Sequence, residues 1–176
     1  MKLKNSVLFC ILFGILHIQA AHVIMLMGPS CAGKSTISNQ LCLQLNSTST
    51  QWIVVDFDTV DENINLLIAT TNQYLSRNIN VIIDTNTYEK NMEDRFQELS
   101  FITKIAISAP LNVLLQRDEL RTQKYNRTPK RAKRCRNFVL HSFEKCLSWS
   151  VDLRIDSSIH SVKQCCTLIL DFLRNT

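Results

Sequence analysis

One loop-forming stretch constrains this chain more than any other part of it: Gly28-Pro29-Ser30-Cys31-Ala32-Gly33-Lys34-Ser35. It matches the phosphate-binding pattern G-x-x-x-x-G-K-[ST] at every fixed position. The apolar run 22–27 precedes it as a buried strand would. A helical pattern follows, in which Ile37, Leu41 and Leu45 recur about one turn apart. The sequence therefore predicts a strand, a phosphate loop and a helix in succession.

The use of glycine favours a real nucleotide site over a chance match. The chain has three glycines, and two of them, Gly28 and Gly33, fill the glycine positions of the motif. Glycine lets successive backbone N–H groups surround a phosphate at a helix N-terminus. We expect Lys34 to reach the β- and γ-phosphates of ATP and the Ser35 hydroxyl to ligate Mg²⁺. The predicted nucleotide-binding residues are Gly28, Pro29, Ser30, Cys31, Ala32, Gly33, Lys34, Ser35 and Thr36.

The rest of the chain alternates strand and helix patterns. Further strands are predicted over 51–56, 80–84, 101–108 and 152–156, and helices over 111–121 and 162–173. Thr85–Glu89 resembles the capped start of another helix, running to about Leu99. Alternating strands and helices form right-handed crossovers and a parallel sheet covered on both faces. We therefore expect an α/β fold with one domain over residues 22–176.

Acidic residues follow two of the predicted strands, and open α/β sheets bind ligands at such strand ends. Asp58 is the expected catalytic base, which takes the proton of an acceptor hydroxyl. Asp56 is an alternative base, and a helix N-cap is an alternative role for Asp58. Asp84 ends an apolar strand and is expected to hold Mg²⁺, with structural capping as its alternative role.

Positive charge is concentrated in one segment. Nine Lys/Arg and two acids lie between Arg117 and Arg136, giving +7 there, whereas the whole chain carries +5 and the remainder therefore −2. Arg117 and Arg121 are four residues apart, so on a helix they share a face that can point at one phosphate cluster. Arg127 follows in a polar stretch that we interpret as a lid over the site. A solvated basic face is the alternative interpretation.

The N-terminus has the layout of a secretory signal peptide. A basic start precedes the apolar run 7–18, and Gln19-Ala20-Ala21 offers small residues for cleavage. We interpret residues 1–21 as a leader that directs export or membrane targeting; a cytoplasmic enzyme with a mis-started leader is the alternative. No stable membrane span is expected in the mature domain. The seven cysteines show no zinc-like spacing, so we expect reduced, mostly buried thiols.

Several motifs together resemble the chloramphenicol phosphotransferase-like family of small P-loop kinases. The resemblance spans about His22 to Leu173 and rests on these segments: the phosphate loop, Trp52 six residues before Asp58, Pro110-Leu111-Asn112-Val113 leading to Arg117 and Arg121, and 151–158. It implies a three-layer P-loop NTPase (nucleotide-kinase-like) fold with a five-stranded parallel sheet, flanking helices and a lid. It also implies Asp58 as catalytic aspartate and Gly33, Lys34 and Ser35 as ATP and Mg²⁺ site.

The sequence thus predicts an ATP-dependent phosphotransferase that acts on a hydroxyl of a small molecule. A polynucleotide or nucleoside kinase is one alternative, with the basic segment following a phosphate backbone. A catalytically silent, exported ATP-binding protein is the other. The identity of the phosphate acceptor and the oligomeric state stay open at this point.

Overall fold

A parallel sheet forms the centre of the computed structural model, which describes residues 21–47, 50–89, 92–96 and 101–176. Its five strands lie in the order β2-β3-β1-β4-β5. They are β1 (His22–Met27), β2 (Trp52–Asp56), β3 (Asn80–Thr85), β4 (Phe101–Ser108) and β5 (Leu153–Asp156). The predicted α/β fold with a five-stranded parallel sheet is confirmed.

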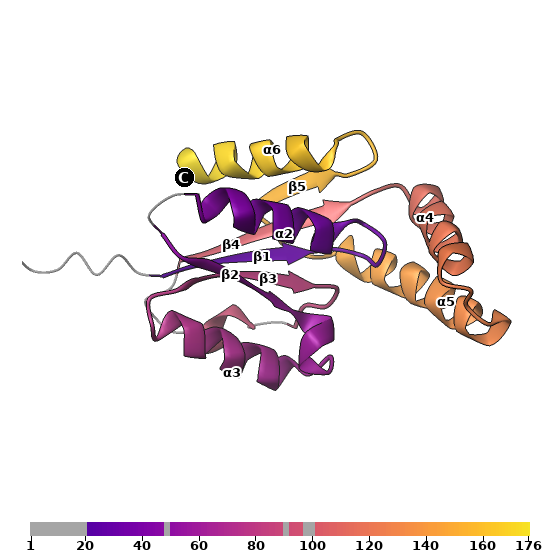
Figure 1. The fold of residues 1–176 in the computed structure, drawn as a ribbon, viewed down its shortest axis with the longest axis horizontal. Coiled ribbons are helices and arrows are strands. Elements are labelled where there is room, and N and C mark those ends of the chain that lie inside the picture. Colours follow the sequence, from indigo (N-terminus) through magenta and orange to yellow (C-terminus); the bar gives the residue numbers. More distant parts are fainter. Residues whose placement is uncertain (1–20, 48–49, 90–91, 97–100) are drawn as a thin grey trace, which may run out of the picture.

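Helices cover both faces of this sheet and extend beyond one end of it (Figure 1). They are α2 (Lys34–Leu45), α3 (Ile64–Leu75), α4 (Leu111–Lys124), α5 (Pro129–Cys146) and α6 (Val162–Arg174). Helices α2 and α6 lie on one face and α3 on the other, while α4 and α5 project past the carboxyl ends of the strands (Figure 1). The predicted lid segment is therefore largely helical, made of the end of α4 and the first half of α5.

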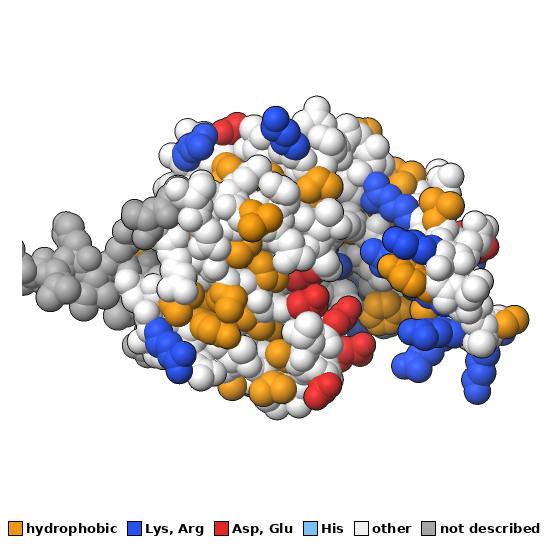
Figure 2. All heavy atoms as spheres, in the orientation of Figure 1, with side chains coloured by type: hydrophobic (Ala, Val, Ile, Leu, Met, Phe, Trp, Pro, Cys, Tyr) orange, Lys and Arg blue, Asp and Glu red, His pale blue; other side chains and the backbone are white. Residues whose placement is uncertain are grey.

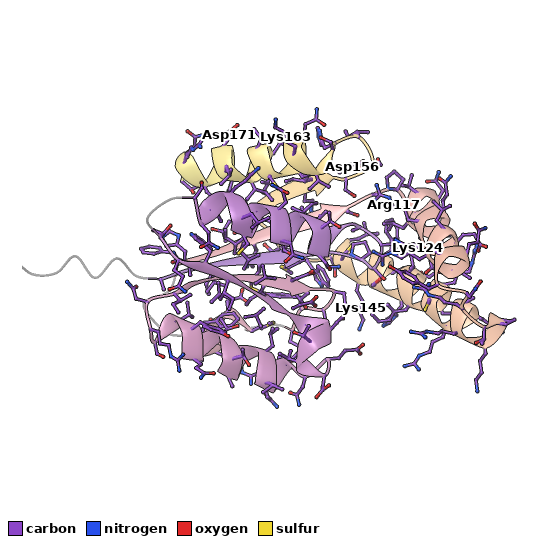
Figure 3. The ribbon with its side chains drawn as sticks, viewed as in Figure 1. Arg117, Lys124, Lys145, Asp156, Lys163 and Asp171 are labelled. Carbon is purple, nitrogen blue, oxygen red and sulfur yellow. The ribbon has the colours of Figure 1, made fainter. Side chains whose placement is uncertain are left out.

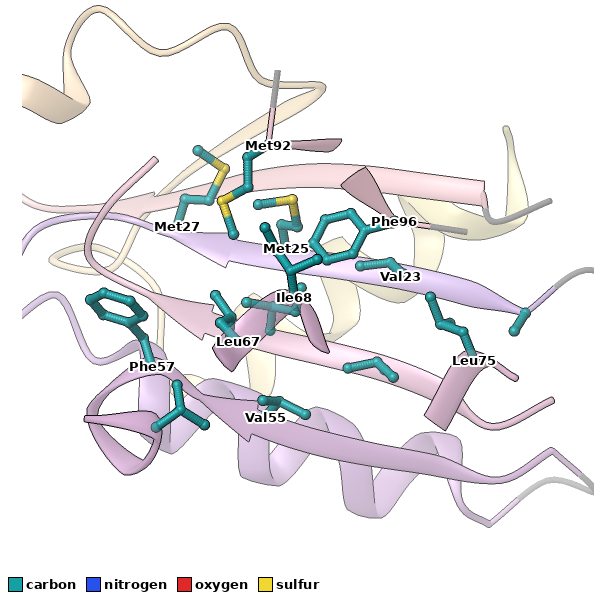
Figure 4. Close-up of a cluster of buried hydrophobic side chains, with 14 of the residues drawn as sticks. Val23, Met25, Met27, Val55, Phe57, Leu67, Ile68, Leu75, Met92 and Phe96 are labelled. Atoms are coloured by element: carbon teal, nitrogen blue, oxygen red, sulfur yellow. The ribbon is translucent and has the colours of Figure 1, made fainter. Parts of the chain in front are cut away.

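Two apolar cores, one on each face, hold the layers together. Strand β1 contributes to both, because alternate side chains point to opposite faces and its last five residues are all buried. Ile24 and Leu26 pack with residues of α2 and α6. Val23, Met25 and Met27 pack on the other side with α3 and the β3–β4 connection (Figure 4). The phosphate loop thus leaves the central strand of the sheet.

The helix expected after β3 is wrong over the residues that the structure describes. Thr85 instead forms a local turn: its Oγ1 accepts a hydrogen bond from the Thr87 N–H at 3.1 Å and donates one to the Thr87 carbonyl at 2.9 Å. A short 3-10 helix follows at Glu93–Arg95. Met92 and Phe96 on either side of it are buried in the core, so tertiary packing holds this connection in place. The remainder of the predicted helix, at 90–91 and 97–100, lies outside the described residues.

Most of the predicted leader, residues 1–20, also lies outside the described residues. Its last residue, Ala21, is buried, and its carbonyl accepts a hydrogen bond from the Phe101 N–H at 3.3 Å. Within the described ranges, none of the helices combines the length and the apolar character needed to cross a membrane. The six cysteines of those ranges are free thiols, and four of them are buried.

Candidate active site

The phosphate loop takes its shape from two glycines. Gly28 has φ +150°, and a Cβ at this position would lie 1.9 Å from the Ile107 carbonyl oxygen on β4. Gly33 has φ +92° and is the N-cap of α2, where it supplies no side-chain cap. The first N–H groups of a helix lack internal partners and bind anions well. Cys31 also has a positive φ, +67°, which is uncommon for a residue other than glycine.

A pocket of about 70 Å³ lies over this loop, at the carboxyl ends of β1, β2 and β3. We call it the phosphate pocket. Residues from four separate segments line it: Ser30, Cys31, Gly33, Lys34, Ser35, Thr36, Asp56, Asp58, Asp84, Asn86 and Arg121. The convergence expected from strand ends is therefore present. Three of the predicted nucleotide-binding residues belong to the loop but do not line this pocket: Gly28, Pro29 and Ala32.

Lys34 is a buried cation surrounded by carboxylates. Its side chain donates to the Pro29 carbonyl at 3.2 Å, and the residue is only 8% exposed. Burial lowers the pKa of Lys34, and the negative charges of Asp84, Asp58 and Asp56 act in the opposite direction. This cation is held at the base of the pocket, where an entering phosphate would meet it.

Asp84 has the features of a magnesium ligand. It is 3% exposed, and its Oδ2 has no hydrogen-bond partner among the described residues. Burial raises the pKa of Asp84, while Lys34 and a hydrogen bond with Ser35 lower it. A buried carboxylate oxygen without a partner, beside a serine hydroxyl, fits a hard cation that also keeps water and phosphate ligands. Ser35 and Asp84 together would hold Mg²⁺.

The structure separates the roles of the two aspartates after β2. Asp56 Oδ1 accepts the Asp58 N–H at 2.9 Å and so caps the 3-10 helix Phe57–Val60. The Asp58 carboxylate lines the phosphate pocket, and no side chain in the described ranges is hydrogen-bonded to it. Burial raises the pKa of Asp58, the negative charge of Asp56 raises it further, and Lys34 lowers it. Asp56, not Asp58, is therefore the capping residue.

The three predicted arginines make different contacts. Arg117 donates to the Cys31 carbonyl at 3.3 Å and to the Ser157 Oγ and carbonyl at 3.0 and 2.7 Å, so it ties the phosphate loop to the segment after β5. Arg121 lines the phosphate pocket, with its Nη1 3.7 Å from Cys31 Sγ. Arg127 is paired with Asp118 on α4 at 2.7 Å. Of these three arginines, only Arg121 lines the phosphate pocket.

A second pocket, of about 330 Å³, adjoins the phosphate pocket and shares Cys31, Gly33, Thr36 and Arg121 with it. Of its other residues, sequence reasoning named Ala32 and Arg117 but did not assign Leu120, Ser157 or His160 to the site. Ser157 and His160 follow β5 at the same sheet edge, and that position was the available signal, whereas Leu120 lies on α4. This hollow is placed to take the nucleoside part of a nucleotide whose phosphates lie on the loop.

A third and larger pocket, of about 880 Å³, lies between the loop and α5, and we call it the lid pocket. Figure 2 shows Lys and Arg side chains gathered over the α4–α5 end and Asp and Glu side chains near the centre of the same view. The lid pocket is lined by Ser30, Glu62, Asp118, Arg127, Thr128, Lys130, Arg131, Arg134, Cys135, Asn137, Phe138 and His141. Sequence reasoning placed basic residues here but did not identify the pocket or Glu62.

Comparisons with known proteins agree with this geometry. The sequence model of the adenylylsulphate kinase family matches residues 20–123, which is more than half of the chain and includes the phosphate loop, Asp58, Asp84, Arg117 and Arg121. A search of curated proteins found no match.

Solved structures show the same fold at low sequence identity. The Mycobacterium tuberculosis APS kinase in complex with AMPPNP and APS has 13% identity and a TM-score of 0.63, over 88% of this chain and 98% of that chain. A gluconokinase from Sinorhizobium meliloti 1021 has 13% identity and a TM-score of 0.61, over 89% and 93%.

The resemblance inferred from the sequence is thus supported at the level of small-molecule P-loop kinases, a class that generally uses ATP and Mg²⁺. The chloramphenicol phosphotransferase-like subgroup is not the family that matches. The chain belongs to the adenylylsulphate kinase family and is a P-loop phosphotransferase that acts on hydroxyl-bearing substrates.

Proposed function

We propose that this protein transfers the γ-phosphate of ATP to a hydroxyl of an anionic small molecule. The observation that carries this proposal is the position of the lid pocket: it meets the phosphate loop at Ser30 and is bounded on its other side by cations of α5. An acceptor held there would present its hydroxyl toward the phosphate pocket, where Asp58 lies.

The residues of the phosphate pocket supply the groups that phosphoryl transfer needs. The nucleophilic hydroxyl oxygen forms a bond to the γ-phosphorus, the bond from that phosphorus to the bridging oxygen breaks, and ADP leaves. Asp58 accepts the hydroxyl proton, while Lys34 and Arg121 stabilise the charge on the transferring group. Mg²⁺ held by Ser35 and Asp84 neutralises charge on the phosphate oxygens when it is bound.

Charge favours an anionic acceptor over a neutral one such as chloramphenicol. Four cations line the lid pocket: Arg127, Lys130, Arg131 and Arg134. They face two acids, Glu62 and Asp118. A neutral acceptor would leave the excess of positive charge without partners, whereas a sulfate or phosphate group pairs well with guanidinium groups. Adenylylsulphate, an anionic nucleotide with ribose hydroxyls, is therefore the first acceptor to test.

The test is acceptor-dependent release of ADP by the full chain with Mg²⁺ and ATP. Adenylylsulphate, gluconate, chloramphenicol and a 5′-hydroxyl oligonucleotide are supplied in turn. We expect turnover with an anionic acceptor, lost in Lys34→Ala and Asp58→Asn. The matched control is Asp61→Asn, which makes the same chemical change at a residue outside the phosphate-pocket lining. Asp61 has a left-handed backbone conformation (φ +52°), which asparagine can also adopt.

Two results would contradict the proposal. Turnover that persists in Asp58→Asn at the wild-type rate would remove the aspartate from its role as base. ATP binding without turnover on any of these acceptors would favour the catalytically silent binding protein instead.

A further inference from the structure

Helix α5 begins with a run of cations that the fold itself does not use. Lys130, Arg131, Lys133, Arg134 and Arg136 are all exposed. Among the described residues, none of these five side chains forms an ion pair, whereas nearby Arg127 pairs with Asp118 at 2.7 Å. Their charges are therefore available to a partner.

These charges destabilise the helix that carries them. The N-terminal end of a helix is the positive end of its dipole, so cations there are unfavourable. Like charges at i,i+3 and i,i+4, such as Lys130 with Lys133 and with Arg134, add a mutual repulsion. No acidic residue lies in the first turn of α5 to offset them. A polyanion bound along the helix would remove this repulsion.

The cations lie on two faces of α5. Lys130, Arg131 and Arg134 line the lid pocket, and Lys133 and Arg136 lie outside its lining. A small acceptor inside the pocket neutralises the first face alone. The pocket-lining residues of α5 run from Lys130 to His141, which corresponds to about 16 Å along the helix axis. That length suits a chain of successive phosphates.

An aromatic ring stands among these charges. Phe138 lines the lid pocket and is 41% exposed, although it is a large apolar side chain. Cations that follow a phosphate backbone, together with an aromatic face on which a base can stack, are the two elements of single-strand binding sites. A flat membrane surface would meet the cations but would leave a ring inside a pocket without a partner.

We propose that the first half of α5 and Phe138 bind a single-stranded nucleic acid, whose phosphates follow the unpaired cations and whose base stacks on the ring. This inference goes beyond the proposed function. It concerns binding of a strand, which requires neither ATP nor Asp58, so the two proposals fail independently. Asp58→Asn should bind the strand as the wild type does.

The test is fluorescence anisotropy of a labelled 12-nucleotide DNA strand of mixed sequence, titrated with the full chain between 50 and 300 mM NaCl. Each phosphate contact on a single strand contributes about 0.7 to the slope of log K against log salt. The variant K133Q/R136Q removes two cations outside the pocket. It should lower the slope by about 1.4 and weaken binding about 25-fold at 0.1 M NaCl.

The matched control is K145Q/K163Q, which changes the net charge equally. Lys163 lies on α6, away from the α4–α5 end, and Lys145 lies in the last turn of α5 (Figure 3). This variant should keep the wild-type slope. Phe138→Ala should weaken binding at least about fivefold with an unchanged slope, because stacking is not a counterion effect.

Any of three results would overturn the inference. The first is the absence of an anisotropy change at 50 mM NaCl. The second is an equal loss of binding in K133Q/R136Q and in the control. The third is binding of the chain to phosphatidylserine vesicles while the DNA strand is not bound.

Discussion

Alanine at each motif glycine probes how closely strand β4 packs against the phosphate loop. At position 28 the new Cβ would lie 1.9 Å from the Ile107 carbonyl oxygen and 3.0 Å from its carbonyl carbon. At position 33 nothing lies within 4 Å of it. Both positions have a positive φ that disfavours alanine, so Gly28→Ala adds a steric overlap with backbone to a strain that both variants share.

These distances set the expected loss of stability. Strain from the positive φ lowers the free energy of unfolding by about 1–2 kcal/mol in Gly33→Ala. Overpacking against β4 adds about 1–3 kcal/mol in Gly28→Ala. Since 1 kcal/mol shifts the Tm of a chain of this size by about 2–4 °C, Gly28→Ala should melt about 2–12 °C below Gly33→Ala.

Thermal unfolding of the two variants, followed by circular dichroism, measures this difference directly. ATP binding by isothermal calorimetry gives a second readout. Gly33 lines the phosphate pocket, so the Gly33→Ala methyl group should weaken ATP binding in a chain that stays folded at 25 °C. Equal melting temperatures, or a lower one for Gly33→Ala, would refute the close approach of Gly28 to β4.

Three further predictions concern carboxylates. Asp84→Asn should abolish Mg²⁺-dependent ATP binding in calorimetry yet leave the chain at least as stable to heat, because it replaces a buried carboxylate whose pKa burial raises. Asp58 acts as a base when it is deprotonated, and its pKa is raised first by burial and then by the negative charge of Asp56. Asp56→Asn should therefore lower the pKa of Asp58 and move the acid limb of the pH–rate profile to lower pH. Asp118→Asn breaks a buried ion pair and should lower the free energy of unfolding in urea by about 1.5–3 kcal/mol, whereas exposed Glu119→Gln should change it by less than about 0.5.

The sequence predicts most of the sheet edge that forms the phosphate pocket. Apolar runs that end in Asp56 and Asp84 mark strands by pattern alone, and parallel strands bring their carboxyl ends together. The chain has only three glycines, and two of them, Gly28 and Gly33, have a positive φ in the phosphate loop. The sequence therefore offers few other places for such a loop. These features are local or follow from topology, which explains why a single sequence reveals them.

The lid pocket and the β3–β4 connection are not predictable in this way. The pocket depends on how α5 is inclined to α4, and that angle is set partly by the Arg127–Asp118 pair and the left-handed residue Asn126 between the helices. The connection follows a local hydrogen bond at Thr85 and the burial of Met92, both of which override a helix-like start. Contacts between residues distant in sequence carry no periodic signal.

The central position of β1 also has a consequence for synthesis on the ribosome. This strand is made first, yet Val23 pairs with Val81 and His22 pairs with Phe101. At 5–20 residues per second, roughly 4–16 s separate the end of β1 from the end of β4. During that interval the apolar strand β1 lacks its neighbour β4. The turn at Gly28 also lacks the Ile107 backbone, against which it packs in the folded protein. A nascent chain that ends before β4 should therefore bind chaperones rather than nucleotide, and ATP should stabilise only chains that extend past β4.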